Sequence, residues 1–345
     1  MEGDFVMEGD NVKNDHAYNR LMSTPVWGSL LVFGFVLAPL IYPQHYFTQI
    51  LSLAMIASIL AMSLQLVIGY TGQLSIGHAA FYGIGAYTSA LLMIKLNLPF
   101  ILAFIGAGAV AAIFSLAFVP ITRLRGTYLA VATLGFTIIV HLLLLNEEEI
   151  TGGSFGLMNI PYPSFAGWVF KSPRSIYYLD LFVAILTYLS LRRIVNSRFG
   201  RALQSIKENE DAARSCGINL TVYKSKCFVI AAFIAGLAGS LYAHMQLYLN
   251  PNDFTFWKSI EIVLMVVVGG AGLVGGIVGG IVLVFSLEYL RAWGQLRMVF
   301  YGALLIIFMG FGEKGLVGFF EWVKNKIWSL KSRSARNHAI GVKPL

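Results

Sequence analysis

Long apolar runs, separated by short polar segments, occupy most of this 345-residue chain. A helix that crosses the hydrocarbon core of a membrane needs about 20 predominantly apolar residues. Runs of this kind lie at residues 26–42, 47–68, 78–95, 100–119, 127–146, 176–195 and 224–247, and a shorter one lies at 298–312. The pattern predicts an all-α, polytopic helical membrane protein with one transmembrane domain over residues 26–312.

One further apolar region, residues 260–290, is too long for one ordinary span. It is interrupted at Gly269-Gly270-Ala271-Gly272, which predicts two short helices that meet at this turn. With the other runs, these helices give about ten membrane segments. Small residues four apart let helix backbones approach closely in lipid, so we expect helix packing at Gly272, Gly276 and Gly280.

Lys and Arg are distributed unevenly over the polar segments. They are frequent in the loop 196–223, in the turn 120–126 and in residues 313–345, whereas the loop 147–175 begins with three glutamates. Basic loops stay on the cytoplasmic side of a membrane. We therefore expect both termini in the cytoplasm, with residues 1–25 as a disordered tail and residues 313–345 as a basic tail.

The composition supports a membrane protein and excludes several other classes. Hydrophobic residues make up 57% of the chain, charged residues 12%, and the mean hydropathy is +0.72. A soluble domain carries about 25% charged residues. The pattern GxxxxGK[ST], which binds nucleotide phosphates, does not occur, and the GxGxxG at residues 270–275 lies in an apolar run rather than after a strand.

The side chains that carry most chemistry are sparse. The spacing of Cys216 and Cys227 is neither that of a metal site nor that of a disulfide framework. We find no paired carboxylates, histidine cluster or nucleophile motif, so we expect no catalytic residue, cofactor, metal or nucleic acid partner. Ionisable groups within spans suggest function by default, although each of these is more readily explained structurally. They are His78, His141, Asp180, His244, Glu261 and Glu288.

Segment 69–78 interrupts two apolar runs with glycines and polar side chains. Irregular backbone at membrane depth is tolerated only where it is buried in protein or lines a water-filled cavity. Two interpretations stay open: an ordinary cytoplasmic turn, and a turn beside the pore near its cytoplasmic mouth. The candidate residues are Gly69, Gly72, Gln73, Ser75, Gly77 and His78.

The loop 196–223 contains a short helix with well-defined predicted ends. Asn209 is a good N-cap, acids follow in the first turn, and Gly217 suits the left-handed position after the last turn. So short a helix is not stable alone in water. We interpret it as a docking helix with a flat alanine face, the alternative being a solvated basic loop. The candidate docking residues are Asn209, Glu210, Asp211, Ala212, Ala213, Arg214 and Gly217.

Three stretches, 69–92, 123–136 and 200–244, resemble the inner-membrane permease subunits of branched-chain amino acid ABC importers, most nearly those of the LivM type. The resemblance covers most of residues 45–315. It implies a multi-pass inner-membrane protein that works with two cytoplasmic ATPase subunits (LivG/LivF-like), a second permease (LivH-like) and a periplasmic substrate-binding protein. Membrane lipid would surround it.

Permeases of ABC importers carry a cytoplasmic loop with Glu-Ala-Ala and a glycine four residues after the second alanine. Here Asp211-Ala212-Ala213 and Gly217 match that spacing, with Asp where Glu is usual. The Ile-x-Leu-Pro that often follows is absent. The resemblance implies that this loop docks on the ATPase and transmits its ATP-driven motion to the spans.

Other functions remain open beside a branched-chain amino acid importer. Permeases for urea or short-chain amides are near relatives of this family. An ion-coupled secondary carrier would need discontinuous helices at the membrane midplane, and the breaks at 69–77 and 269–280 partly fit that requirement. A carrier of that kind has no need of a capped docking helix.

Overall fold

The computed structural model describes residues 35–39, 44–117, 126–165, 167–270, 272–290 and 302. The chain divides into two compact units, Met1–Gln49 and Ile50–Leu345. Of the first unit, a helical stretch at 35–39 and the start of one long helix are described. The expected tails 1–25 and 313–345, the turn 120–125 and the span 298–312 lie outside the described residues, apart from residue 302.

Helices make up nearly all of the regular structure. Their bounds are α3 (His45–Thr71), α4 (His78–Lys95), α5 (Phe100–Leu116), α6 (Thr127–Asn146), α7 (Glu148–Thr151), α8 (Pro173–Val195), α9 (Arg198–Glu208), α10 (Glu210–Ser215), α11 (Leu220–Gln246), α12 (Phe256–Gly269) and α13 (Leu273–Tyr289). The 3₁₀ turns among the described residues are η2 (Gly153–Phe155) and η3 (Pro251–Phe254). The strands β1 (Ser164–Phe165) and β2 (Trp168–Val169) pair antiparallel. The all-α prediction is confirmed.

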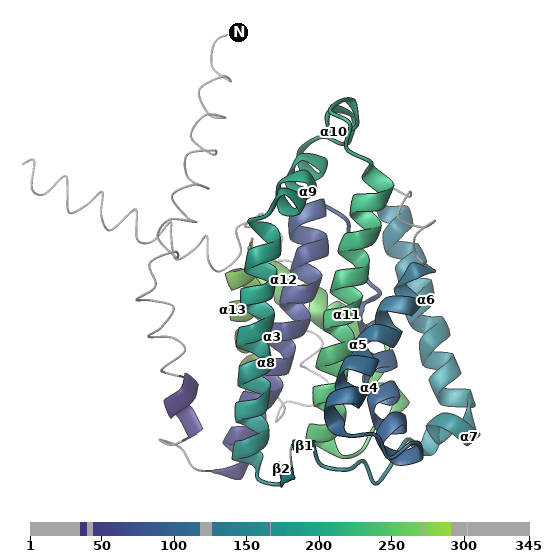
Figure 1. The fold of residues 1–345 in the computed structure, drawn as a ribbon, viewed down its shortest axis with the longest axis vertical. Coiled ribbons are helices and arrows are strands. Elements are labelled where there is room, and N and C mark those ends of the chain that lie inside the picture. Colours follow the sequence, from purple (N-terminus) through teal and green to yellow (C-terminus); the bar gives the residue numbers. More distant parts are fainter. Residues whose placement is uncertain are drawn as a thin grey trace, which may run out of the picture. The chain divides into compact units, whose positions relative to one another are not determined.

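Within the second unit the long helices run side by side, with α9 and α10 at one end and β1, β2 and α7 at the other (Figure 1). Among the described residues, α3, α6 and α11 are each long and apolar enough to cross a membrane. The bent pair of α12 and α13, with 119° between its helices, passes the same test when taken as one span. The expected total of about ten segments stays a prediction.

Helical structure is interrupted between α12 and α13, at the predicted turn. Gly270 and Gly272 have φ values of +82° and +87°, a region that glycine enters without steric cost. Beyond this turn, α12 and α13 pack so closely that a Cβ on Gly279 would collide with the carbonyl oxygen of Met265. The glycines therefore allow both the turn and the close return of α13 along α12.

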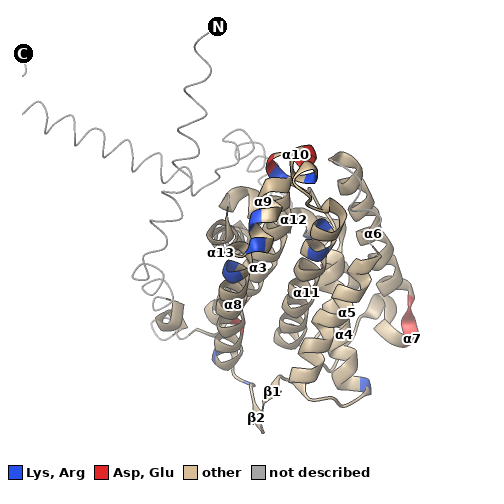
Figure 2. Ribbon diagram, turned by 45° about the horizontal axis from the view of Figure 1, so that its top comes forward, with Lys and Arg blue, Asp and Glu red and all other residues tan. Residues whose placement is uncertain are grey.

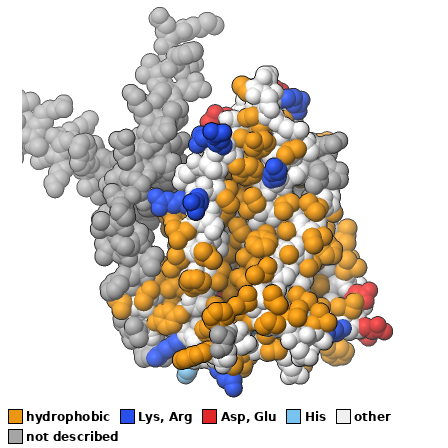
Figure 3. Space-filling model, in the orientation of Figure 1, with side chains coloured by type: hydrophobic (Ala, Val, Ile, Leu, Met, Phe, Trp, Pro, Cys, Tyr) orange, Lys and Arg blue, Asp and Glu red, His pale blue; other side chains and the backbone are white. Residues whose placement is uncertain are grey.

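Charged residues of the described helices are concentrated near the helix ends, although Asp180 lies inside α8. Figure 2 shows them on α9, α10 and the adjoining ends of α8 and α11, and again on α7. Between these ends the visible face is covered mainly by hydrophobic side chains (Figure 3). Large apolar residues of α6, such as Val131, Ile139 and Leu143, are more than half exposed. An apolar belt between two charged ends is the surface expected of a protein embedded in lipid.

Candidate functional site

The α9–α10 segment, residues 198–215, forms the charged end of the second unit. Ser197 caps α9 through a hydrogen bond from the backbone N–H of Phe199 to its Oγ, at 3.1 Å. Asn209 then caps α10, because its Oδ1 accepts hydrogen bonds from the N–H groups of Asp211 and Ala212, each at 3.0 Å. These bonds satisfy N–H groups that a helix start leaves without partners. Asn209 itself has extended backbone, so the chain turns there from one helix into the next.

The C-terminal end of α10 is closed by its own backbone. The N–H of Gly217 donates to the carbonyl oxygen of Arg214, and the N–H of Ile218 donates to that of Ala213, at 3.0 and 3.1 Å. This is the Schellman pair of bonds, which requires a left-handed residue between helix and loop. Gly217 supplies it with φ +83°.

The two alanines of α10 face different surroundings. Ala213 is 3% exposed and packs in a small apolar cluster with Ile206 and Leu220, against which Ile218 and Tyr223 also pack. Ala212 is exposed, as are Asp211 and Arg214. The expectation of one flat face made by both alanines is therefore wrong, since neighbouring helical residues point about 100° apart. The exposed face of α10 is formed by Asp211, Ala212, Arg214 and Ser215.

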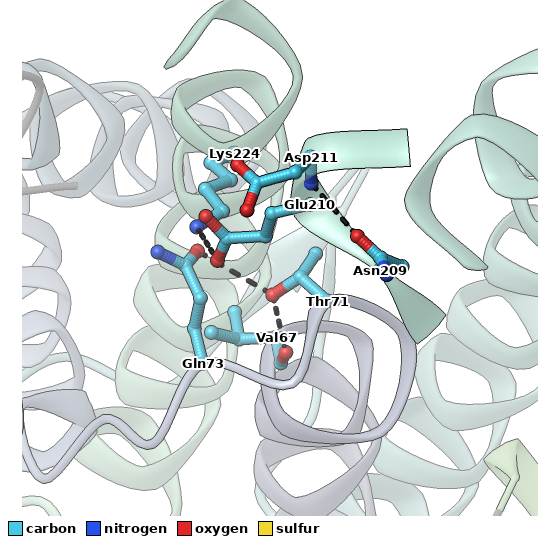
Figure 4. A network of polar contacts seen from close by, with 7 residues as sticks. All are labelled: Val67, Thr71, Gln73, Asn209, Glu210, Asp211 and Lys224. Atoms are coloured by element: carbon cyan, nitrogen blue, oxygen red, sulfur yellow. Dashed lines mark hydrogen bonds and ion pairs between the residues drawn. The ribbon is translucent and has the colours of Figure 1, made fainter. Parts of the chain in front are cut away.

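An ion pair joins the first turn of α10 to the first turns of α11. Lys224 Nζ lies 2.7 Å from Glu210 Oε1, and the two side chains are 4% and 26% exposed. Lysine is almost never so fully buried unless it is paired. Figure 4 shows this pair beside the end of α3, with the side chain of Gln73 pointing toward it.

The segment between α3 and α4, residues 72–77, has buried polar side chains and hydrogen bonds to α6. Gln73 and Ser75 are 5% and 0% exposed, whereas Gly72 before them and Leu74 between them are exposed. The N–H of Ile76 donates to Thr133 Oγ1 at 2.9 Å, and Thr137 Oγ1 donates to the carbonyl oxygen of Ile76 at 3.0 Å. Side chains of α6 thus provide hydrogen-bond partners for backbone groups of this segment, which is not helical and cannot pair them internally.

The remaining residues of this segment fix its shape. Gly72 has φ +69°. Gly77 packs against Thr133: a Cβ added to Gly77 would lie 3.1 Å from the Cβ of Thr133. A Cβ on Gly69 would meet the amide of Gln65 at 2.5 Å. His78 is 1% exposed, and within the described residues neither of its ring nitrogens has a hydrogen-bond partner.

Most of the other ionisable side chains noted within spans have structural partners. His244 Nε2 lies 2.8 Å from Ser89 Oγ, and its Nδ1 lies 2.8 Å from the carbonyl oxygen of Pro161. His141 Nδ1 contacts the carbonyl oxygen of Pro251 at 3.1 Å, and Glu261 pairs with Lys258 at 2.9 Å. The two histidines thus tie the residues around Pro161 and Pro251 to α11 and α6, whereas the Glu261–Lys258 pair lies within α12.

Asp180 on α8 differs from the other ionisable groups within spans. It is 1% exposed, and neither carboxylate oxygen has a hydrogen-bond partner of ordinary geometry among the described residues, Ser52 being the neighbouring hydroxyl. An unpaired buried carboxylate is costly, which makes it a functional candidate. Over the residues that the structure describes, no group of three or more His, Cys, Asp or Glu side chains is placed to hold a metal.

The glycines of α13 lie against α3. A Cβ on Gly276 would lie 3.0 Å from the backbone nitrogen of Met62, and one on Gly280 would lie 2.7 Å from that of Ser58. Gly272 instead precedes the helix and forms the turn. Sequence reasoning missed the close backbone contact of α4 with α11, in which Gly85 meets Gly236. It also missed Lys224, Thr133 and Thr137, although two threonines four apart in an apolar run are a polar signal.

Comparison with known proteins identifies the family. Residues 46–309 match the family model described as the permease component of the branched-chain amino acid transport system, so the chain belongs to this family. The high-affinity branched-chain amino acid permease protein LivM of Escherichia coli K12 is 37% identical over 295 residues, covering 78% of this chain and 69% of that protein. LivM of Salmonella typhimurium is 36% identical over the same shares.

More distant relatives extend the comparison. The permease protein LivH of Escherichia coli K12 is 26% identical, covering 76% of this chain and 91% of that protein. The galactofuranose transporter permease YtfT of the same organism is 26% identical, covering 66% of this chain and 65% of that protein. No solved structure matches the chain. The relatives are transport permeases, which confirms the resemblance drawn from residues 69–92, 123–136 and 200–244.

Proposed function

We propose that the chain is the translocation subunit of an ATP-binding-cassette importer for branched-chain amino acids. The names of its LivM and LivH relatives support the substrate class. Such an importer would contain a second, LivH-like permease, two cytoplasmic ATPase subunits that hydrolyse ATP, and a periplasmic binding protein that delivers the amino acid.

The observation that carries this proposal is α10, a capped helix at the charged end of the helices. Its two ends are closed by the Asn209 side chain and by the turn at Gly217, and Ala213 anchors it in an apolar cluster. A helix held in this way presents Asp211, Ala212 and Arg214 outward. We propose that this face docks on the ATPase, that this end lies in the cytoplasm, and that both chain termini lie there too.

Docking would convert ATP-driven closure of the ATPase subunits into movement of the spans. The expected change is a rigid-body switch between outward-open and inward-open arrangements. In this scheme the permease contributes no catalytic residue. Its role is to hold the translocation path and to receive the motion at α10.

The substrate class is tested by uptake into vesicles that contain the assembled importer. We expect ATP-dependent uptake of labelled leucine, isoleucine and valine, with urea and acetamide as the competing substrates to be measured beside them. Uptake that followed an ion gradient and ignored ATP would favour a secondary carrier. ATP-driven uptake of urea or acetamide alone would assign the substrate to the amide branch.

The docking claim is tested with Ala212→Asp, which places a charge on the exposed face of α10 without entering the cluster around Ala213. We expect loss of transport and of stimulated ATP hydrolysis, with normal insertion. The matched control is Asn97→Asp, in the exposed loop between α4 and α5. Ala213→Asp is unsuitable, because it would bury a carboxylate in the cluster and unfold the segment.

A native thiol gives a second readout of docking. Cys216 is exposed just after α10, whereas Cys227 is buried in α11. We expect added ATPase subunits to protect Cys216 from a maleimide several-fold, and Cys227→Ser to leave the labelling unchanged. Labelling at the same rate with and without the ATPase, together with full transport by the Ala212→Asp variant, would contradict docking at α10.

A further inference from the structure

The end of α3, which is distant in the sequence, meets the consecutive helices α10 and α11 at one junction. The end of α3, the start of α11 and the first turn of α10 meet around the ion pair between Glu210 and Lys224 (Figure 4). Thr71 Oγ1, in the last turn of α3, donates to the carbonyl oxygen of Val67 at 2.6 Å and lies 3.4 Å from Gln73 Oε1. Gln73 is buried, and its side chain points toward the pair (Figure 4).

Two contacts show that this junction reaches both helices. The Sγ of Cys227 donates to the carbonyl oxygen of Leu66 at 3.4 Å, and Cys227 lies three residues after Lys224, on the same face of α11. That face therefore looks toward the end of α3. A Cβ on Gly72, directly after α3, would lie 3.4 Å from Lys207 Cγ, so α9 also rests on this turn.

The ion pair adds a polar link between α10 and α11 to the apolar contact between Ala213 and Leu220. α10 is folded by its cap, by its closing turn and by Ala213, and none of these involves Lys224. A buried ion pair is weak evidence for stability, because desolvation offsets the attraction between the charges. Its effect is geometric instead: a short charge-assisted hydrogen bond fixes the distance between α10 and α11.

We propose that Glu210 and Lys224 are the positioning residues through which movement of α10 is transferred to α11 and to the turn after α3. This inference rests on the proposed function, since it presumes that α10 receives motion from an ATPase. In this proposal the pair acts through the two helices that it joins. It keeps α10 in register with the spans, so that ATP hydrolysis and translocation stay linked.

The test compares ATP hydrolysed with leucine transported, measured in the same vesicles containing the assembled importer. Glu210→Gln and Lys224→Met each remove one charge of the pair. The matched controls make the same changes two residues away, at exposed positions: Glu208→Gln on α9 and Lys226→Met on α11. Glu210→Asp keeps the charge but shortens the side chain by one methylene, so it remains informative if the stronger variants do not fold.

We expect Glu210→Gln and Lys224→Met to raise the ATP hydrolysed per leucine transported at least tenfold, and Glu210→Asp to raise it about threefold. The two controls should change it less than twofold. A variant that only lost stability would lower hydrolysis and transport together and leave their ratio unchanged.

An unchanged ratio in the variants of the pair, or an equal rise in the controls, would overturn the inference. Failure of the proposed function has a different signature. In that case the unmodified importer itself would show no ATP-dependent uptake of leucine, isoleucine or valine.

Discussion

Two regions of the molecule are built in opposite ways. One is the helix group formed by α4, α5 and α11, and the other is the α9–α10 segment. In the helix group the backbones touch: Gly85 of α4 meets Gly236 of α11, and a Cβ on Gly236 would lie 2.6 Å from the carbonyl oxygen of Ala107 on α5. Small residues at such contacts let helices associate over a long, close surface. Packing of this kind has little room to adjust.

The α9–α10 segment is attached mainly through side chains. One buried ion pair and a small cluster of apolar residues connect α10 with α11. Side chains can adopt other rotamers at modest cost, whereas closely packed backbones cannot separate without losing contacts along their length. The comparison indicates that α4, α5 and α11 are packed as one rigid body, to which α10 is attached through a few side-chain contacts.

The largest expected effect comes from opening the helix group. Gly85→Leu places a branched side chain against the backbone of α11. Overpacking by single methylenes already costs about 1–3 kcal/mol, so we expect more than about 3 kcal/mol here and loss of folded protein. Size-exclusion chromatography in mild detergent measures this directly. Gly135→Ala on α6, where a Cβ would meet nothing within 4 Å, is the control and should fold normally.

A smaller loss is expected where polar contacts, rather than backbones, hold the same group. His244→Phe keeps a ring beside Phe100 but removes the contacts to Ser89 and to the carbonyl oxygen of Pro161. Leaving buried polar groups unpaired costs about 1–3 kcal/mol. We expect a lower thermal midpoint in detergent, with a smaller shift for His141→Phe. Equal midpoints for His244→Phe and the unmodified protein would show that these contacts add no rigidity.

On the side of the α9–α10 segment, Asn209→Ala removes the N-cap of α10. Loss of such a cap costs about 1 kcal/mol. Because α10 has only six residues, we expect this loss to speed hydrogen exchange at the amides of Asp211 and Ala212 without changing the thermal midpoint of the whole protein. Asn209→Ser retains a capping oxygen and should exchange slowly. A shift of the global midpoint would mean that α10 is part of the rigid group after all.

The smallest effect is expected at Gly217, which has φ +83° and no atom within 4 Å of the place a Cβ would take. Only backbone strain opposes a side chain there. Asparagine enters the left-handed region more readily than other residues, so Gly217→Asn should cost less than about 1 kcal/mol. Hydrogen exchange in residues 213–218 measures this. A cost as large as that of Asn209→Ala would show that the closing turn, rather than the cap, limits the stability of α10.

The helices themselves could be predicted from local pattern. The apolar runs 78–95 and 127–146 coincide with α4 and α6, and the break after Gly269 falls where the glycines interrupt the run. Asn209 and Gly217 stand at the ends of α10, as their residue types indicate. These features depend on neighbours within a few residues, which is why sequence reasoning reaches them.

The candidate site could be predicted only in part. The sequence identified α10 but gave Ala213 an open face, because burial by Ile206 and Leu220 depends on how α9 and α11 come together. The segment 69–78 was recognised as unusual, yet its bonds to Thr133 and Thr137 come from a helix more than 50 residues away. Nothing in the local pattern distinguishes Lys224 from Lys226, although one is buried in an ion pair and the other is exposed.

By itself, then, the sequence determined that this is a helical membrane protein, where most of its described helices lie, which family it resembles and where a capped helix interrupts a basic loop. Hydrophobic periodicity, turn chemistry and charge are properties of short segments and can be read along the chain. The tertiary structure decided which glycines bring backbones together, which face of α10 is open and which lysine meets Glu210. Those outcomes depend on contacts between residues far apart in the chain, where burial and pairing are set by the packing of whole helices.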